Sequence, residues 1–513
     1  MAHAAPDPVS WAKVIDQEKC IGCHACTTAC KSENEVPLGV NRTFVKYVDV
    51  GVFPTARRAF QVTRCNQCDD APCTHACPTS AMARRPNGIV DFDKAACIGC
   101  KACIAACPYD AIFINPDDST AEKCNLCAHR LDIGLEPACV VVCPTEAILV
   151  GDLADPSSRV AQIAAREPVT VRRPEKDTQP KLFYRGAHQA TLDPLAAARP
   201  PGDLFLWSEQ ARGADAINGG HPGAVRSQAA AVLAYDVPHK APWDWRVSLY
   251  TLTKGISAGA YLIAALLVLA GKLHPTGTLW RTSAPLIALI FLAITGVLLL
   301  ADLERPARFY FIFTRPQWRS WLVRGAFILC GYGLVLAAHL GASWLGLGPA
   351  VHRALLVPAI PLAALTAVYT AWLFAQAKGR DLWQSPLLPP HMLVQSLLAG
   401  SAALIFPALT RETGAVPVLL VTLAGASLVH LLMVAGEAAL PHATAHARLA
   451  GAEMVSGRYR TYFWLGALLV TIALAAPAAT GPASAATIAA CALAGLGSFE
   501  HAYVQAGQSV PLA

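Results

Sequence analysis

The chain has 513 residues, of which 54% are hydrophobic and only 15% are charged. A soluble globular chain carries about 25% charged residues, so this composition argues against a wholly soluble protein. The net charge of +6 is too small to make a case for nucleic-acid binding.

Cysteines are concentrated at the N-terminal end. Sixteen of the 18 lie within the first 143 residues, and they form four quartets. Three of the quartets end in a Cys-Pro step. The quartets are Cys20, Cys23, Cys26 and Cys30; Cys65, Cys68, Cys73 and Cys77; Cys97, Cys100, Cys103 and Cys107; and Cys124, Cys127, Cys139 and Cys143.

These spacings are typical of bacterial ferredoxins, in which three close thiolates hold one cluster and the fourth reaches the neighbouring cluster. Sixteen thiolates therefore predict four 4Fe-4S clusters in series, which is an electron-transfer chain. A disulfide framework is disfavoured because residues 1–19 contain no apolar signal segment and three thiols share one short loop. Structural zinc is disfavoured by four complete quartets with trailing prolines.

An internal repeat accompanies the quartets. The third and fourth Cys-Pro steps each lead into a short helical step and then an apolar strand, at 111–114 and 147–150. A weaker copy follows Cys77-Pro78. We therefore expect residues 1–150 to form an α+β, bis-ferredoxin-like domain with four iron–sulfur clusters.

Residues 151–245 contain no cysteine and are rich in Pro, Ala, Arg and Gly. We expect an irregular linker here, one that either lies on a partner or is simply flexible.

The remaining residues, 246–513, are dominated by long apolar runs. Each run is about the length that spans a bilayer as a helix, so we expect an all-α bundle of eight transmembrane helices. The runs are 247–271, 282–302, 323–346, 353–376, 391–409, 415–436, 461–480 and 484–506.

Eight spans place both termini on one side of the membrane. The loops on that side carry ten Lys and Arg residues, against four in the opposite loops. The positive-inside rule and the lack of an export signal in residues 1–19 predict a protein of the bacterial inner membrane whose cluster domain is cytoplasmic. The ten are Arg305, Arg308, Arg315, Arg319, Arg324, Lys378, Arg380, Arg448, Arg458 and Arg460; the four are Lys272, Arg281, Arg353 and Arg411.

Both halves resemble known families. Residues 12–150 resemble the four-cluster iron–sulfur subunit of dimethyl sulfoxide reductase-type molybdenum enzymes. Residues 243–512 resemble the NrfD membrane anchor of polysulfide reductase, on the stretches Trp243 to Ala260, Asp302-Leu303-Glu304-Arg305-Pro306, and Tyr369 through Lys378-Gly379-Arg380 to Pro386. In most systems these are separate subunits, whereas here they are fused.

The resemblance implies a pairing of the quartets and a function. Three thiols of one quartet would share a cluster with the last thiol of another, and the anchor would bind menaquinone or ubiquinone without haem. A molybdopterin-containing catalytic subunit, the membrane quinone pool and the lipid bilayer would be the partners. The implied cluster sets are Cys20, Cys23, Cys26 with Cys143; Cys124, Cys127, Cys139 with Cys30; Cys65, Cys68, Cys73 with Cys107; and Cys97, Cys100, Cys103 with Cys77.

Ionisable residues near or inside the spans are candidates for a quinone site. Tyr250, Lys254, Asp302 and Arg305 fall in the family-like stretches, and we predict that they bind the quinone. Taken one at a time, each could instead be an interfacial anchor or a helix cap.

The sequence thus predicts a non-catalytic electron-transfer and membrane-anchor subunit of a quinone-linked molybdopterin oxidoreductase. One alternative is a subunit of a quinol-oxidising or proton-translocating complex with cytochrome partners. In that case Glu437, His430, Glu500 and His501 would form a proton relay. A redox sensor or assembly anchor is the remaining alternative.

Overall fold

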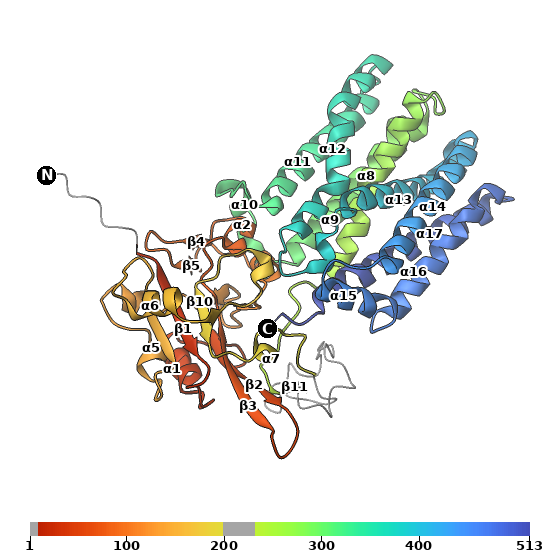
Figure 1. Cartoon of the computed structure of the whole chain (residues 1–513). Helices are drawn as coiled ribbons and strands as arrows, with labels where there is room; N and C mark the ends of the chain where they lie inside the picture. The colour runs from red at the N-terminus through yellow and green to blue at the C-terminus, as the bar shows by residue number, and fades with distance from the viewer. Residues whose placement is uncertain (1–8, 199–230, 513) are drawn as a thin grey trace.

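The computed structural model describes residues 9–198 and 231–512. They form a cysteine-rich domain, which contains all four quartets, and a bundle of long helices that we call the membrane domain (Figure 1). The cysteine-rich domain lies against one end of the bundle. Both expected halves of the fold are therefore present, an α+β domain followed by a helical one.

Two sheets frame the cysteine-rich domain. One has the strand order β8-β1-β10-β9, with β1 parallel to β10 and antiparallel to β8. The other has the order β11-β2-β3 and is antiparallel. The strands are β1 (Trp11–Asp16), β8 (Ile148–Asp152), β9 (Val169–Thr170), β10 (Leu182–Arg185), β2 (Thr43–Val50), β3 (Arg57–Arg64) and β11 (Ala231–Tyr235).

Two small hairpins and several short helices complete the cysteine-rich domain. The strands expected after the third and fourth Cys-Pro steps are present as β6 and β8. The hairpins are β4 (Met82–Arg84) with β5 (Val90–Phe92), and β6 (Ile112–Ile114) with β7 (Ala121–Lys123). The helices are α1 (Ala25–Glu33), α2 (Pro72–Ala76), α3 (Ala102–Ala106), α4 (Ala128–Leu131), α5 (Ala138–Val141), α6 (Arg159–Arg166) and α7 (Gln189–Leu192).

The expectation of an irregular linker at 151–245 needs correction where the structure describes this segment. Strands β9 and β10 complete the first sheet, and β11 adds an edge to the second. Leu182 and Tyr184 of β10 are buried in the core beside β1. The strand is only four residues long and its partner lies far away in the sequence, so local composition could not reveal it. Residues 199–230 lie outside the described residues.

Within the described ranges, eight helices are long and apolar enough to cross a membrane, which agrees with the eight predicted runs. Shorter helices, α10 (Phe311–Thr314) and α15 (Ala445–Val455), lie between them. The long helices are α8 (Trp245–Leu269), α9 (Ala284–Ala301), α11 (Trp321–Trp344), α12 (Pro349–Ala375), α13 (Leu388–Arg411), α14 (Val416–Ala439), α16 (Arg460–Ile472) and α17 (Pro482–Gln508).

Helices α8 and α13 form the centre of the bundle. In the most apolar stretch of each helix, 72% of the residues of α8 and 67% of those of α13 are buried, more than in any other span. The two backbones touch, because a Cβ added to Gly259 would lie 1.7 Å from the carbonyl oxygen of Ser396. A small residue such as Gly259 is what allows two helices to approach this closely. The outer helices instead expose apolar side chains such as Leu334 and Val357, as lipid contact requires.

The two domains share one hydrophobic core. Ala76, Ala102 and Ala106 from the cluster loops pack in the same cluster of buried residues as Trp243 and Phe374. The C-terminal residues run from α17 back to the cysteine-rich domain, where Arg172 donates a hydrogen bond to the carbonyl of Leu512 (2.8 Å).

Candidate functional site

The cluster loops have a repeated backbone shape. Gly22 and Gly99, each two residues after the first cysteine of a quartet, both have φ near +70°, and His24 and Lys101 follow with φ of 58° and 61°. Alternating right- and left-handed residues turn successive N–H groups towards one point, which makes a concavity that binds anions. The same local sequence therefore folds into the same thiolate-binding loop twice.

The sixteen thiols gather into four groups, and each joins three thiols of one quartet to the last thiol of another. Neighbouring thiols interact electrostatically within each group, and Asn34 donates to both Cys30 Sγ (3.7 Å) and Cys127 Sγ (3.6 Å). We number the groups from the outside inwards. The first group is Cys20, Cys23, Cys26 and Cys143; the second is Cys124, Cys127, Cys139 and Cys30; the third is Cys65, Cys68, Cys73 and Cys107; the fourth is Cys97, Cys100, Cys103 and Cys77.

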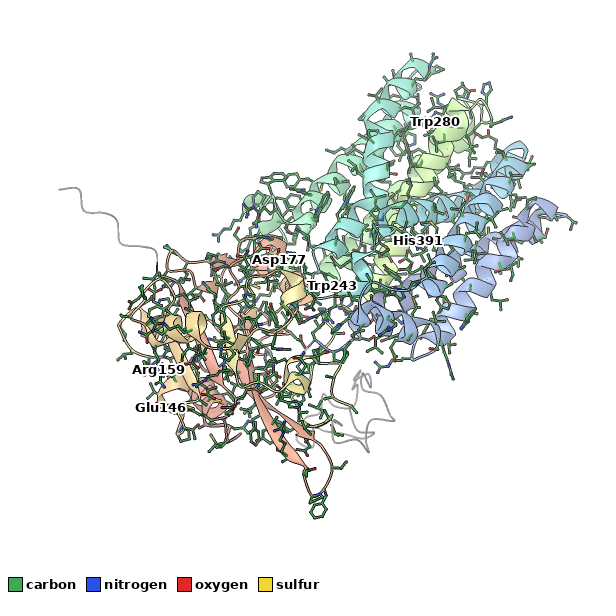
Figure 2. All side chains as sticks on the ribbon, in the orientation of Figure 1. Glu146, Arg159, Asp177, Trp243, Trp280 and His391 are labelled. Atoms are coloured by element: carbon green, nitrogen blue, oxygen red, sulfur yellow. The ribbon has the colours of Figure 1, made fainter. Side chains whose placement is uncertain are left out.

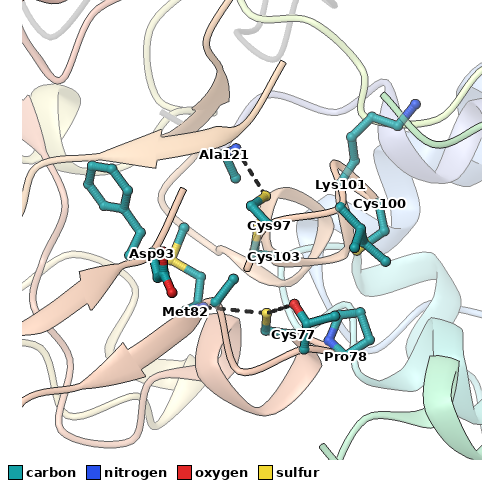
Figure 3. Close-up of a pocket in the computed structure, with 13 residues that line it drawn as sticks. Cys77, Pro78, Met82, Asp93, Cys97, Cys100, Lys101, Cys103 and Ala121 are labelled. Carbon is teal, nitrogen blue, oxygen red and sulfur yellow. Dashed lines mark hydrogen bonds between the residues drawn. The ribbon is translucent and has the colours of Figure 1, made fainter. Parts of the chain in front are cut away.

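The fourth group shows how such a group fits a cluster. All four of its thiols line one cavity, closed by Pro78, Met82 and other side chains (Figure 3). The N–H of Met82 donates to Cys77 Sγ and that of Ala121 to Cys97 Sγ, both at 3.4 Å. Across the described ranges, no three His, Cys, Asp or Glu side chains converge on one point where a single metal ion could sit. Four thiols around one cavity suit a cluster of several iron atoms.

Burial keeps most of these thiols protonated until metal binds. Desolvation raises the pKa of Cys30 to about 12, and burial likewise raises the pKa of Cys107 to about 11. Two thiols of the second group differ: burial raises the pKa of Cys139 and of Cys124, but Lys13 and Arg64 outweigh this, lowering the pKa of Cys124 and bringing that of Cys139 to about 7. Iron binding would have to displace these protons, so assembly of the clusters should depend on pH.

The four groups lie in series. Cys26 of the first group interacts electrostatically with Cys139 of the second. Lys123 interacts with thiols of both the second and third groups, and Cys103 of the fourth interacts with Cys73 of the third. The first group lies at the outer end, where Cys23 is exposed.

The fourth group meets the membrane domain. Trp243, just before α8, donates its indole N–H to the carbonyl of Cys100 (3.3 Å). Lys101 Nζ lies 3.1 Å from Asp302 Oδ1 at the end of α9, and Arg308 donates to the carbonyl of Cys97 (3.2 Å). The series of thiol groups therefore ends where the cysteine-rich domain meets the end of the bundle, beside Trp243 (Figure 2).

The Lys378-Gly379-Arg380 stretch also belongs to this junction. A Cβ added to Gly379 would lie 2.6 Å from the carbonyl oxygen of Cys107, so only glycine allows this approach to the third group. On either side of it, Lys378 pairs with Asp70 (3.2 Å) and Arg380 donates to the carbonyl of Gln508 (3.0 Å).

The four predicted quinone residues are not all brought together. Lys254 is buried in α8, where Nζ donates to the carbonyl of Ala367 (2.8 Å) and to Thr370 Oγ1 (2.9 Å). Tyr250, one turn earlier, is 2% exposed, and its hydroxyl faces Thr370, the side chain that also accepts from Lys254.

The other two predicted quinone residues belong to the domain junction. Asp302 pairs with Lys101, and Arg305 is half-buried in the loop after α9. The backbone N–H of Arg305 donates to the carbonyl of Ile98 (3.3 Å).

Residues from three further helices join Lys254. They line a small cavity with it, namely Ala367 of α12, Met392, Gln395 and Ser396 of α13, and Leu496 and Glu500 of α17. Glu500 interacts electrostatically with Lys254. A charged residue inside a span marks Glu500 in the sequence, whereas Gln395 and Thr370 carry no such signal.

Two further groups of buried side chains in the bundle contain histidine. His391 Nε2 and His430 Nδ1 are 2.9 Å apart, packed on Phe499. His339 instead bonds the hydroxyl of Tyr261 (3.0 Å), with its ring against Trp280. Trp280 lies towards the far end of the bundle, and His391 closer to the cysteine-rich domain (Figure 2).

Comparison with known proteins identifies both halves. The family described as Polysulphide reductase, NrfD matches residues 236–511. This protein belongs to the NrfD family. A 4Fe-4S dicluster domain matches residues 56–153, and a 4Fe-4S binding domain matches residues 11–32. The protein is therefore a fusion of an iron–sulfur domain with an NrfD membrane domain.

Curated relatives match the iron–sulfur part. A tetrathionate reductase subunit of Salmonella typhimurium is 42% identical over 207 residues, which covers 39% of this chain and 80% of the relative. The protein NrfC of Escherichia coli is 43% identical over 178 residues, or 34% of this chain and 80% of the relative. The arsenate respiratory reductase iron–sulfur subunit ArrB of a Shewanella species is 36% identical over 219 residues, with coverages of 33% and 94%.

Proposed function

We propose that this chain is the electron-transfer and membrane-anchor subunit of a quinone-linked molybdopterin oxidoreductase. The observation that carries the proposal is the series of four thiol groups that runs from an exposed face to the membrane domain. Each group would hold one 4Fe-4S cluster through its four cysteines. Bound clusters supply one-electron carriers; the chain's own loops space them, bury them and exclude water from them.

The outer end of the series is where a catalytic partner would dock. Apolar side chains next to Cys143 of the first group are exposed, namely Val141 (60%) and Val142 (39%). Ile21, between Cys20 and Cys23, is also exposed (56%). Exposed apolar side chains beside a redox group favour a protein interface. The relatives' names support a reductase partner, because two of them describe subunits of tetrathionate and arsenate reductases.

The inner end is where a quinone would exchange electrons. The cavity beside Lys254 is lined by residues of four helices, among them the polar side chains of Lys254, Gln395 and Glu500. Lys254 and Glu500 can donate to quinone oxygens and supply protons. Tyr250 brings a buried hydroxyl one turn from Lys254. We propose Tyr250 and Lys254 as quinone contacts, whereas Asp302 and Arg305 would act by holding the fourth group against the membrane domain.

The cluster domain would lie in the cytoplasm, and the anchor in the bacterial inner membrane. The support is the excess of Lys and Arg in the loops on the cluster side. Protease treatment of intact spheroplasts tests this orientation: the cluster domain should stay protected, and cleavage of it there would reverse the orientation.

The main experiment is anaerobic affinity purification of the whole chain from detergent-solubilised membranes, followed by partner identification and analysis for molybdenum and tungsten. A large partner with either metal, and clusters that a quinol analogue reduces or reoxidises, are the expected result. Cytochrome partners without either metal would contradict the proposal.

A second function, as part of a proton-translocating complex, is favoured by one observation. The far half of the bundle, beyond any quinone site near the clusters, contains the buried polar groups Tyr261, His339 and His352, and the imidazole of His352 is bonded to Ser343 (2.9 Å). Buried ionisable groups in spans are typical of proton paths. Proteoliposomes that build no pH gradient during quinone turnover would rule this function out.

A further inference from the structure

Lys13 and Arg64 of the cysteine-rich domain are buried, and no carboxylate among the described residues forms an ion pair with either. Lys13 on β1 is 2% exposed, and Arg64 at the end of β3 is 1% exposed. Arg64 Nε and Nη2 have no hydrogen-bond partner in the described part of the chain. A buried charge costs several kcal/mol unless an opposite charge compensates it, so the fold must place negative charge beside both side chains.

Both cations point at one sulfur. Arg64 Nη1 lies 3.0 Å from Cys139 Sγ, and Lys13 Nζ lies 3.6 Å from the same atom. These two residues come from different sheets, and Cys139 comes from α5. Three distant segments thus converge on the second thiol group, and the thiolates of that group are the negative charge that compensates the two cations.

The fourth group is arranged differently. Lys101, beside Cys100, is already paired with Asp302 (3.1 Å) and Glu304 (3.4 Å). Between the second and third groups, Lys123 donates to the carbonyl oxygens of Val90 and Cys124. In the described residues, only Lys13 and Arg64 direct a side-chain cation at a thiol sulfur.

From this arrangement we propose that Lys13 and Arg64 are positioning residues that make the second group the highest-potential site in the series. The inference rests on the proposed function, in which each group holds a cluster. A reduced cluster carries one more negative charge than an oxidised one, so buried cations and N–H···S bonds stabilise the reduced form. One electron enters from a neighbouring group, which is oxidised by one electron, and no proton is required because the cations already compensate the added charge.

The consequence is an electron reservoir inside the series. The second group lies between the first group, at the partner face, and the third. An electron that arrives from either end rests there until a second follows, which suits a protein that joins two-electron chemistry at both ends.

The test is a redox titration of the purified whole chain, followed by EPR, with the variants Arg64→Met and Lys13→Met. In the unmodified protein, one reduction step should have the highest potential. In both variants that same step should move to a more negative potential. The expected shift is at least tenfold in the reduction equilibrium constant, about 59 mV for one electron. Arg64→Lys keeps the charge and should keep most of the potential. Arg185→Met is the matched control, because Arg185 is a more exposed cation already paired with Asp16 and Glu167.

The iron content distinguishes a failure of the proposed function from a failure of this inference. An unmodified protein without four clusters would refute the proposed function itself. Variants that keep four clusters but show unchanged potentials would overturn the inference alone. Loss of the second cluster in both Arg64→Met and Lys13→Met would also overturn it, because the cations would then hold the cluster rather than set its potential.

Discussion

Lys101 of the cluster domain and Asp302 of the membrane domain form an ion pair of 3.1 Å in which each side chain is only 9% exposed. Lys101 lies between Cys100 and Ala102 in the loop of the fourth group, and Asp302 ends α9. The pair therefore fixes the last thiol group to the membrane domain at the point where electrons would leave the series.

Breaking this pair should loosen the junction. Lys101→Met leaves Asp302 buried without its partner, which costs about 3–5 kcal/mol for a buried pair. We expect faster proteolysis between the domains and slower oxidation of the clusters by a quinone, measured on the same preparation. Arg58→Met, which removes a half-exposed pair with Asp49 of β2 at 2.6 Å, is the control and should change neither. Unchanged oxidation kinetics in Lys101→Met would show that the pair does not align the junction.

The stability of the same region should depend on pH through His239. Its ring nitrogens lie 2.5 Å from Asp110 Oδ2 and 3.3 Å from Asp236 Oδ1. Burial lowers the pKa of His239, but Asp236 and Asp110 outweigh this and raise it to about 9.

Because the folded pKa lies above the ordinary value of about 6.5, the stabilisation is complete below that value and is lost as the pH rises through about 9. Thermal unfolding measured from about pH 6 to about pH 10 should show a loss of about 1–3 kcal/mol. His239→Gln should be less stable at the acid end and should flatten the profile. A variant that keeps the full pH dependence would contradict the assignment to His239.

Removal of the Lys254 side-chain charge should slow electron exchange with the quinone and leave the clusters intact. Lys254→Met removes a charged donor from the cavity, so the rate of cluster oxidation by a quinone should fall about 10- to 100-fold, as expected for the loss of about 1.5–3 kcal/mol of charged hydrogen bonding. The iron content should not change. Lys272→Met, at an exposed position after α8, is the matched control. Equal oxidation rates in the two variants would show that Lys254 does not contact the quinone.

The ligand assignment predicts the effect of Cys26→Ala. The first group should lose its cluster, about four iron atoms per chain, and the second group should be perturbed because Cys26 and Cys139 are neighbours. Cys330→Ala is the control, because Cys330 lies in α11 at a position exposed on the bundle surface and should be a passive apolar residue. EPR that still shows four reduced clusters in Cys26→Ala would refute the assignment.

Several features of the fold were predictable because they are encoded locally. The spacing of a quartet specifies the loop around it, as the matching φ angles at Gly22 and Gly99 show. The length of an apolar run specifies a span, and all eight runs correspond to long helices. Some arginines assigned to membrane topology proved to have a second use: Arg308, for example, donates to carbonyls of the cluster loops. Composition cannot separate those two roles.

The sequence by itself determined the ligand types, the number of thiols, the number of spans and the families of the two halves, because these depend on residues close together in the chain. The tertiary structure brings together the thiols whose pairing the family resemblance implied, and it alone decided that β10 pairs with β1 and that Arg64 and Lys13 meet at Cys139. It also placed Glu500 beside Lys254 and moved Arg305 to the junction. Burial energies and charge compensation act between segments far apart in the sequence, so local patterns cannot report them.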